Sequence, residues 1–369
     1  MKIALLSYST KPRGGVVHTL ALAEALARAG EDVTVWTLGR DGDTGFFRPV
    51  DPRVRLAIVP FGDLGPDEGV GARILRSIAV LRSGFTPEPY DVVHAQDCIS
   101  ANAVDQCVRT VHHLDQFTTP ELIACHDRAI TRPFGHICVS RAVADELYAG
   151  WGIRATVIPN GVDAERFALA AGPDGNASAA RQRWRDRLGR YVLAVGGIEP
   201  RKGSLDLLEA YALLAESDPD LRLVIAGGET LFDYRDYRAA WDKRATELDV
   251  SPLVLGPVVH DELPSLVAAA DVFCFPSVKE GFGLAAMEAL AAGVPVVTRD
   301  LPVLREVFRD AARFAADPPG FADQMLAALH SPASHRSSGQ TLAAHYTWDA
   351  AAAAHLDLYA RQNSRTRLR

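Results

Sequence analysis

The sequence is poor in cysteine, and its few cysteines are not spaced for metal binding. Among 369 residues there are five, with no CxxC pair: Cys98, Cys107, Cys125, Cys138 and Cys274. An odd number without paired spacing favours buried thiols in a reducing cytoplasm over disulfide bonds or a zinc site.

Long hydrophobic runs are also missing. No apolar stretch approaches the ~20 residues that a membrane span requires. The apolar start MKIALLSY is short and runs into KPRGG instead of a cleavage site, so it is typical of a first strand and not of a secretory signal. We expect a soluble, cytoplasmic protein.

Positive charge is in deficit, and one nucleotide-binding fingerprint is absent. A net charge of -7 gives no support for nucleic-acid binding, which depends largely on basic residues. The pattern G-x-G-x-x-G does not occur, which argues against a simple NAD enzyme.

What the sequence has is a repeated alternation of short apolar runs with helical patterns or turns. KIALLSY, DVTVWTL and DVVHAQ are examples before Asn160, and YVLAVGG, RLVIAGG and VFCFPS follow it. Near-continuous hydrophobic strands between helices predict parallel sheets covered on both faces. Because 369 residues exceed what one core usually supports, we predict an α/β protein of two Rossmann-like domains.

The stretch KEGFGLAAMEALAAGVPVV carries the strongest functional pattern. It predicts a strand, a glycine loop and a helix, with Glu280 on the loop and Glu288 about one turn into the helix. Free backbone N–H groups at a helix start favour an anion, and Gly283 allows close approach of a ligand. Carboxylates accept hydrogen bonds from sugar hydroxyls, so a phosphate-linked sugar would use both features.

Two other loops have a matching character. Arg201 and Lys202 in VGGIEPRKGS lie between a strand and a helix, where adjacent cations could hold a diphosphate leaving group. Gly14 and Gly15 lie at the first strand-to-helix turn, where backbone N–H groups could meet a phosphate. Taken singly, each pattern is more often a solvated surface.

Together these motifs resemble retaining glycosyltransferases of family 4, which have the GT-B fold of two Rossmann-like domains facing a central cleft. EGFGLAAME is similar to their donor-site Glu-x7-Glu motif, and further likeness runs along the chain in GGVVHTLALAEAL, ICVSRAVADEL, VIPNGVD and LGPVVHDELPSL. The resemblance implies four parts: an acceptor-binding domain (1–165), a linker with a short helix (166–190), a nucleotide-sugar donor domain (191–345), and a C-terminal helix packing back on the first domain, with a basic tail (346–369).

The resemblance also implies roles for individual residues. The expected catalytic residues are His112, Arg201, Lys202 and Glu280. The expected donor-binding residues are Gly14, Gly15, Val258, Phe282, Gly283, Leu284 and Glu288. Weaker acceptor-side candidates are His94, Asp97 and His113. The position of Arg201 departs from the family pattern, because many relatives place an arginine directly after the strand, where this chain has Gly196-Gly197.

The implied reaction is transfer of a sugar from a UDP- or GDP-sugar to an acceptor hydroxyl, by front-face displacement with retention and without a metal or other cofactor. Asp218-Pro-Asp220 matches the DxD pattern of manganese-dependent enzymes, but such short matches are common by chance. Two alternatives stay open: a UDP-sugar epimerase of the related two-Rossmann type, and an inactive nucleotide-sugar binding protein. The sequence identifies neither the acceptor nor the base.

The segment VGARILRSIAVLRSGF predicts a basic amphipathic helix. Its apolar residues are Ile74, Leu75, Ile78 and Leu81, and its basic residues are Arg73, Arg76 and Arg82. Such a helix could make weak peripheral contact with the anionic inner face of a membrane. The favoured interpretation is a helix that covers the first sheet.

Overall fold

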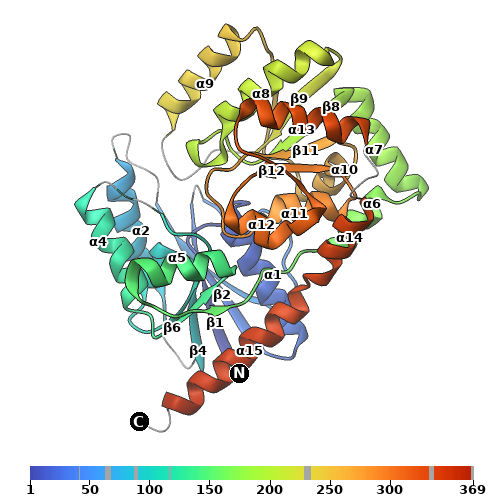
Figure 1. Ribbon diagram of the computed structural model, residues 1–369. Helices are drawn as coiled ribbons and strands as arrows, with labels where there is room; N and C mark the ends of the chain where they lie inside the picture. The colour runs from blue at the N-terminus through green and yellow to red at the C-terminus, as the bar shows by residue number, and fades with distance from the viewer. Residues whose placement is uncertain are drawn as a thin grey trace. The chain divides into compact units, whose positions relative to one another are not determined.

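The computed structural model describes residues 1–40, 42–62, 68–86, 90–115, 117, 119–227, 234–331 and 336–366. The chain forms two compact units (Figure 1). Unit 1 combines Met1–Gly161 with Thr347–Arg369, and unit 2 is the intervening Val162–Tyr346. Within the described residues, no helix is both long and apolar enough to cross a bilayer.

Unit 1 is built on a seven-stranded parallel sheet in the order β3-β2-β1-β4-β5-β6-β7. Its strands are β1 (Lys2–Leu6), β2 (Asp32–Gly39), β3 (Arg55–Pro60), β4 (Val92–Ala95), β5 (Val108–Val111), β6 (Gly135–Cys138) and β7 (Thr156–Val157). Its helices are α1 (Gly14–Arg28), α2 (Val70–Gly84), α3 (Cys98–Ala103), α4 (Pro120–Thr131), α5 (Arg141–Trp151) and α15 (Trp348–Thr366).

The core of unit 1 explains its strand sequences. β1 and β2 are nearly continuous apolar runs because helices cover both faces, and Ile3, Leu5 and Val33 have no exposed surface. The last helix, α15, packs along α1 (Figure 1) and buries Tyr359 completely in the same cluster. The C-terminal segment is therefore part of the first sheet's core.

Unit 2 contains a six-stranded parallel sheet in the order β10-β9-β8-β11-β12-β13. Its strands are β8 (Arg190–Val195), β9 (Leu221–Ala226), β10 (Leu253–Gly256), β11 (Val272–Phe275), β12 (Val296–Arg299) and β13 (Arg313–Ala315). Its α-helices are α6 (Ala164–Ala171), α7 (Gly175–Leu188), α8 (Ser204–Ser217), α9 (Arg235–Glu247), α10 (Leu263–Ala268), α11 (Leu284–Ala291), α12 (Pro302–Phe308), α13 (Pro318–His330) and α14 (Arg336–His345). Short 3-10 turns are η1 (Pro200–Lys202), η2 (His260–Glu262) and η3 (Arg309–Ala311).

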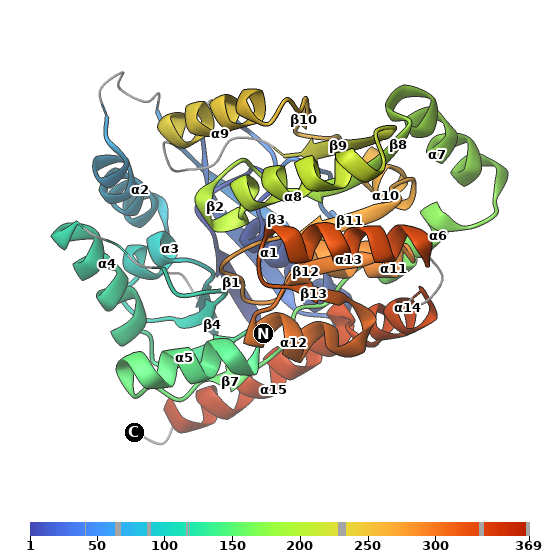
Figure 2. The same cartoon turned by 45° about the horizontal axis from the view of Figure 1, so that its top comes forward.

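Helices α8 and α13 run side by side over one face of this sheet (Figures 1 and 2). Leu208, Phe321 and Met325 are fully buried between these helices and the strands. This apolar layer fixes the strands whose ends carry the functional loops.

Both sheets reverse their strand order at one point, between β1 and β4 in unit 1 and between β8 and β11 in unit 2. In open parallel sheets, ligands bind beyond the carboxyl ends of the strands at such a switch point. A site is therefore expected at the loops after β1, β4, β8 and β11. The predicted glycine motif follows β1, the cation motif follows β8 and the glutamate motif follows β11.

The structure departs from the sequence prediction in two places. Strand β13, at the sheet edge, was not predicted, because three residues are too few to show a strand pattern. The alanine-rich stretch near 166–190 is mostly helical, since Asp163 caps α6 and Asp174 caps α7.

Candidate functional site

Three charged side chains converge at the switch point of unit 2. Glu280, in the loop after β11, accepts a hydrogen bond from Lys202 Nζ at 2.6 Å and one from Arg201 Nη1 at 3.1 Å, both at Oε1. Its side chain is only 12% exposed. The structure thus brings together three residues predicted from two separate motifs, at the carboxyl ends of the strands, where a ligand is expected.

A fourth charge, Glu199, was missed by the sequence analysis. Its side chain is 8% exposed, and its Oε1 accepts a hydrogen bond from Arg201 Nη2 at 3.2 Å. Arg201 is therefore held between two carboxylates, whereas Lys202 contacts Glu280 and lies 5.1 Å above the Phe275 ring. The EP pair directly before RK in the sequence was the available signal.

The loop that carries the two cations depends on a glycine. Gly203 has φ +65, and a Cβ there would collide with the Pro276 carbonyl oxygen. A residue with a side chain would shift the turn Pro200–Lys202, which places Arg201 and Lys202 beside Glu280.

The start of α11 leaves backbone N–H groups beside the glutamate loop. Gly283 is the N-cap with φ +89, and a Cβ at this position would lie 2.8 Å from Phe308 Cζ. Phe282 is 3% exposed and packs edge-on against Tyr346, so its side chain belongs to the core and only its main chain can serve a ligand. Leu284 is the half-buried first residue of the helix.

Glu288 lies on α11 in a poorly hydrated position. Burial raises the pKa of its carboxyl from 4.5 to about 7, with Arg166 opposing and Asp163 reinforcing the shift. A carboxylate that carries this desolvation cost gains from a ligand that supplies hydroxyl donors.

The loop after β10 approaches the same region through Arg166. Arg166 Nη2 donates a hydrogen bond to the His260 carbonyl oxygen, and the same guanidinium acts on Glu288. The half-buried Val258 lies two residues before His260 in this loop. Arg166 was not predicted, because the contact joins residues 94 positions apart and leaves no local pattern.

In unit 1, the glycine turn and the predicted histidine meet. A Cβ on Gly15 would lie 3.8 Å from His112 Cδ2 and 3.9 Å from Nε2, so this edge of the ring faces the start of α1. A Cβ on Gly14 would have no described residue within 4 Å. Burial lowers the pKa of His112 to about 3, so the imidazole is neutral near pH 7. The Gly14–Gly15 turn and the neutral His112 therefore lie at the same end of the sheet.

His112 is held by a second histidine that the sequence analysis did not select. The His18 ring lies edge-on to it, with centroids 4.6 Å apart, and His18 Nδ1 is 2.9 Å from Asn160 Oδ1. The line of rings continues through His355 to His94. Burial lowers the pKa of all four, which keeps this histidine row uncharged.

The acceptor-side candidates have different surroundings. His94 has no exposed surface, and its two ring nitrogens lie 2.6 Å from Tyr359 Oη and 2.8 Å from Thr110 Oγ1. Asp97 caps α3 through Ser100 N at 2.8 Å, and burial raises its pKa to about 6. His113 lies 3.1 Å from Asp115 at the half-exposed end of β5.

The remaining sequence candidates lie apart from these groups. Asp218 follows the last residue of α8 and pairs with Arg190 at the start of β8. It therefore lies at the amino end of this strand, whereas Lys202 lies beyond its carboxyl end. In the described part of the chain, no group of three or more potential metal ligands occurs. On α2, Ile74 and Leu81 face inward, Arg82 donates to the Asn102 carbonyl oxygen at 2.7 Å, and Leu75 is 43% exposed.

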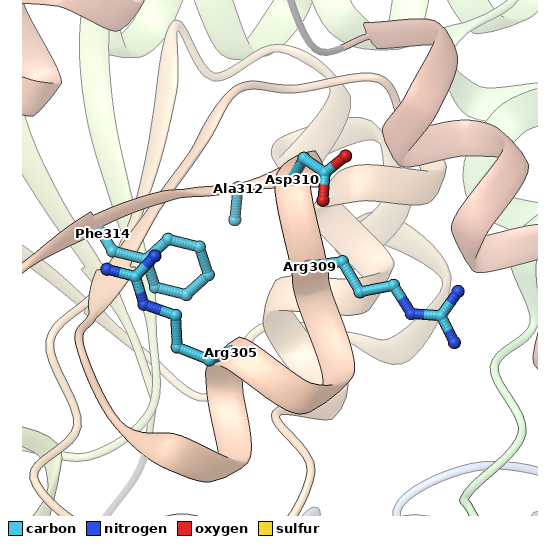
Figure 3. A pocket seen from close by; sticks show the side chains of 5 residues that line it. All are labelled: Arg305, Arg309, Asp310, Ala312 and Phe314. Carbon is cyan, nitrogen blue, oxygen red and sulfur yellow. The ribbon is translucent and has the colours of Figure 1, made fainter.

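A cavity of about 460 Å³ lies beside β13 and is lined by Arg305, Arg309, Asp310, Ala312 and Phe314 (Figure 3). Arg305 lies 4.1 Å above the Phe314 ring and pairs with Asp300. The Arg309 side chain extends away from Arg305 and Phe314 (Figure 3). β13 is the outer strand of the sheet, and β12 and β11 separate it from β8. This cavity contains none of the predicted site residues.

Comparison with known families finds two matches that together span most of the chain. The family "Glycosyltransferase Family 4" matches residues 12–166, and "Glycosyl transferases group 1" matches residues 180–368.

Individual relatives of the chain are also named as glycosyltransferases. A phosphatidyl-myo-inositol mannosyltransferase of Mycolicibacterium smegmatis is 31% identical, with 89% of this chain and 84% of that protein aligned. A D-inositol 3-phosphate glycosyltransferase of Xylanimonas cellulosilytica is 29% identical over 99% of this chain and 97% of its own length.

Solved structures confirm the fold. Sucrose-phosphate synthase from Thermosynechococcus elongatus superposes with a TM-score of 0.79 at 22% identity, covering 98% of this chain and 99% of the other. Anabaena HepE, solved with UDP and glucose, gives 0.73 at 19% identity, with 97% and 99% covered. At these identities the likeness shows the fold, which is GT-B.

Proposed function

The chain belongs to glycosyltransferase family 4, and from this premise we propose that it moves a sugar from a nucleoside-diphosphate donor to an acceptor hydroxyl with retention of anomeric configuration. The family match establishes a glycosyltransferase of the GT-B type. The donor class, the stereochemistry and the independence from metals are the proposal.

The convergence of Arg201, Lys202 and Glu280 at the switch point carries the proposal. Departure of a diphosphate builds negative charge at the bond that breaks, and two adjacent cations stabilise that charge. Glu280 holds both cations in place before the donor arrives. When the donor binds, its phosphates take up the cations, and Glu280 can accept hydrogen bonds from sugar hydroxyls.

The other predicted donor residues fit the remaining parts of the donor. The main chain of Phe282, Gly283 and Leu284 and the start of α11 suit the diphosphate, because their N–H groups and the helix dipole favour an anion. Glu288 suits the ribose hydroxyls, and the loop at Val258 suits the base. We assign His112 and the Gly14–Gly15 turn to the sugar and phosphate.

Retention follows from front-face displacement. The acceptor hydroxyl attacks the anomeric carbon on the side from which the diphosphate leaves, and its proton passes to the leaving diphosphate oxygen. In this scheme Glu280 accepts hydrogen bonds from sugar hydroxyls once the donor has taken its two cations, and it is not the nucleophile. The protein's contribution is orientation and charge stabilisation. A metal would have no role, and the pairing of Asp218 with Arg190 favours this view.

Relatives support a nucleotide sugar as donor. HepE was solved with UDP-glucose as well as with UDP and glucose, and the curated relatives are named for transfer to inositol compounds. We propose a UDP- or GDP-sugar donor, a cytoplasmic location and an acceptor still to be identified. Weak membrane contact through α2 stays a prediction, which flotation with anionic vesicles would test.

Thermal stabilisation by UDP, GDP, ADP and TDP and their sugar conjugates, with EDTA present, tests the proposal. A ligand at 100 times its Kd should stabilise the protein by about 2.7 kcal/mol. We expect a shift with one nucleotide class that is lost in Glu288→Ala. With that donor and an acceptor, the product's anomeric proton coupling should show retention. No shift with any nucleotide, or activity only with a divalent metal, would contradict the proposal.

A further inference from the structure

Four arginines gather in unit 1 beside the carboxyl ends of β1 and β2. Arg13 directly precedes α1, Arg40 directly follows β2, and Arg73 and Arg76 lie on the first half of α2. All four are half-buried. We refer to these residues as the arginine cluster. It is built from three separate chain segments, so it is a product of the fold and not of a charge run.

Aromatic and hydroxyl contacts hold the cluster in place. The guanidinium carbons of Arg40 and Arg76 both lie 4.2 Å from the centroid of Phe61, which is 4% exposed. Arg40 Nη2 also donates to Ser77 Oγ at 2.7 Å. Stacked guanidinium groups with fixed forks are suited to planar, bidentate recognition of an anion.

Within the described residues, Arg76 and Arg40 differ in how their charge is compensated. Arg76 pairs with Glu68 through two 2.8 Å hydrogen bonds. Arg40 forms no salt bridge with any described residue, and its Nε and Nη1 are buried without a hydrogen-bond partner there, as is Arg13 Nε. Burial lowers the pKa of Arg40 to about 10. Tyr8 opposes this shift, and the charges of the other three arginines each add a smaller lowering effect.

A second observation at the neighbouring strand end points to a polar ligand. Gln96 directly follows β4, is 2% exposed, and neither its Oε1 nor its Nε2 has a hydrogen-bond partner among the described residues. Buried amides are normally satisfied, so such a group at a switch point is typical of a site that a ligand completes.

We propose that the arginine cluster binds a phosphate group carried by the acceptor, so that the acceptor of this transferase is a phosphate ester. The inference rests on the proposed function, because it assigns unit 1 to the acceptor. Several guanidinium groups converging from different segments match a group with several terminal oxygens better than a neutral sugar. A bound phosphate would restore acceptors to donors that the protein leaves unsatisfied.

Inorganic phosphate is the first probe, titrated calorimetrically into the full chain with UDP, and in parallel GDP, at saturation to occupy the donor site. We expect phosphate binding that weakens by about tenfold or more in Arg40→Gln, the loss typical of a charged hydrogen bond. Arg13→Gln is the second variant if Arg40→Gln does not fold. Arg82→Gln is the matched control, since Arg82 lies on α2 but outside the cluster, and should change binding less than twofold.

Two further arms distinguish a soluble phosphate ester from a lipid headgroup. Matched polyols with and without a monophosphate serve as acceptors, and flotation compares phosphatidylglycerol with phosphatidylcholine vesicles. Preference for the phosphorylated polyol, lost in Arg40→Gln, supports a soluble acceptor, and Arg40-dependent flotation with phosphatidylglycerol supports a lipid.

Nucleotide binding without phosphate binding, or equal losses in Arg40→Gln and Arg82→Gln, would overturn the inference. Phosphate binding that depends on Arg40 while no nucleotide binds would retain the cluster as an anion site and contradict the donor assignment instead.

Discussion

At the scale of single residues, the proposed donor site has charged groups whose positions suit a ligand better than they stabilise the fold. Lys202 and Arg201 share one carboxylate oxygen of Glu280, and Glu288 lies where its charge is poorly hydrated. Stability alone would not select a half-buried carboxylate with a raised pKa. Such positions are typical of functional sites.

Lys202→Ala should lower turnover by about 10²- to 10³-fold, because in the proposed reaction it removes a cation that stabilises charge on the leaving diphosphate. The measurement is kcat with saturating donor and acceptor, with circular dichroism to verify the fold. Lys243→Ala, at a side chain that is 79% exposed on α9, is the control and should be unaffected. Turnover within threefold of wild type would remove Lys202 from the mechanism.

Glu288→Gln should stabilise the protein while weakening the nucleotide. The folded-state pKa of Glu288 is about 7 and its ordinary value is 4.5, so the folded state binds the proton more tightly. Stability is therefore lost as the pH rises from 4.5 through 7, and a glutamine avoids this loss. We expect a gain on the order of 2 kcal/mol at pH 8 and little at pH 4.5, measured by urea unfolding.

The exposed Glu216→Gln is the control for this substitution and should show no pH-dependent gain. Nucleotide affinity in Glu288→Gln should fall about tenfold, since the ribose loses a charged acceptor. A variant that is less stable at pH 8, or equally active, would contradict the assignment.

At the scale of elements, α15 contributes a buried titratable side chain, His355, to the core of unit 1. His355 lies 5.6 Å from His94 and 6.3 Å from His18, ring to ring, and burial lowers its pKa from 6.5 to about 4. As the pH falls, His355 is protonated in the unfolded chain at a higher pH than in the folded chain. The contribution of His355 to stability is thus complete above pH 6.5 and is lost as the pH falls toward 4.

His355→Phe should therefore flatten the pH dependence of unfolding by up to about 1.4 kcal/mol per pH unit between pH 6.5 and 4. The comparison is the difference between variant and wild type, because Glu288 and Asp97 titrate with the opposite sign in part of this range. His345→Gln, at an exposed position of α14, is the control. An unchanged slope would show that His355 is not a buried neutral group.

Helices, strands and the loops between them are also the features that the sequence predicts best. Near-continuous apolar runs predicted strands in both halves of the chain, among them β1, β2, β4, β8, β9 and β11. The strand–loop–helix pattern selected Glu280, Glu288 and Lys202, which follow the carboxyl ends of strands in one sheet. The same reasoning missed β13, which is too short, and Arg166 and His18, whose partners His260 and Asn160 are distant in sequence. Local patterns report periodicity and turns, whereas these contacts exist only once the sheet has formed.

At the scale of the whole molecule, the chain passes from unit 1 to unit 2 near Gly161 and returns near Thr347. Unit 1 therefore depends on α15, which buries Tyr359 and Ala352 against α1 and the sheet, whereas unit 2 is one continuous segment.

A chain that ends at Tyr346 should keep nucleotide binding in unit 2 and lose stability in unit 1. Removal of a buried tyrosine alone costs several kcal/mol, so we expect unit 1 to unfold at a lower urea concentration. Fluorescence unfolding with and without nucleotide would separate the two transitions. A matched chain that ends at Gln362 keeps Tyr359 and should behave like wild type. A single unfolding transition in the chain that ends at Tyr346, with the same midpoint as in wild type, would contradict the dependence of unit 1 on α15.

The return of the chain to its first unit also sets an order for folding during translation. Domains commonly fold as they leave the ribosome, the N-terminal one first. Here the inserted unit is complete when Tyr346 has emerged, while the unit that was started first still waits for α15. Until α15 has been synthesised, the apolar surfaces of Leu22, Leu26 and Val33 lack the helix that packs in the same core, so unit 1 should need chaperone protection during translation for longer than unit 2.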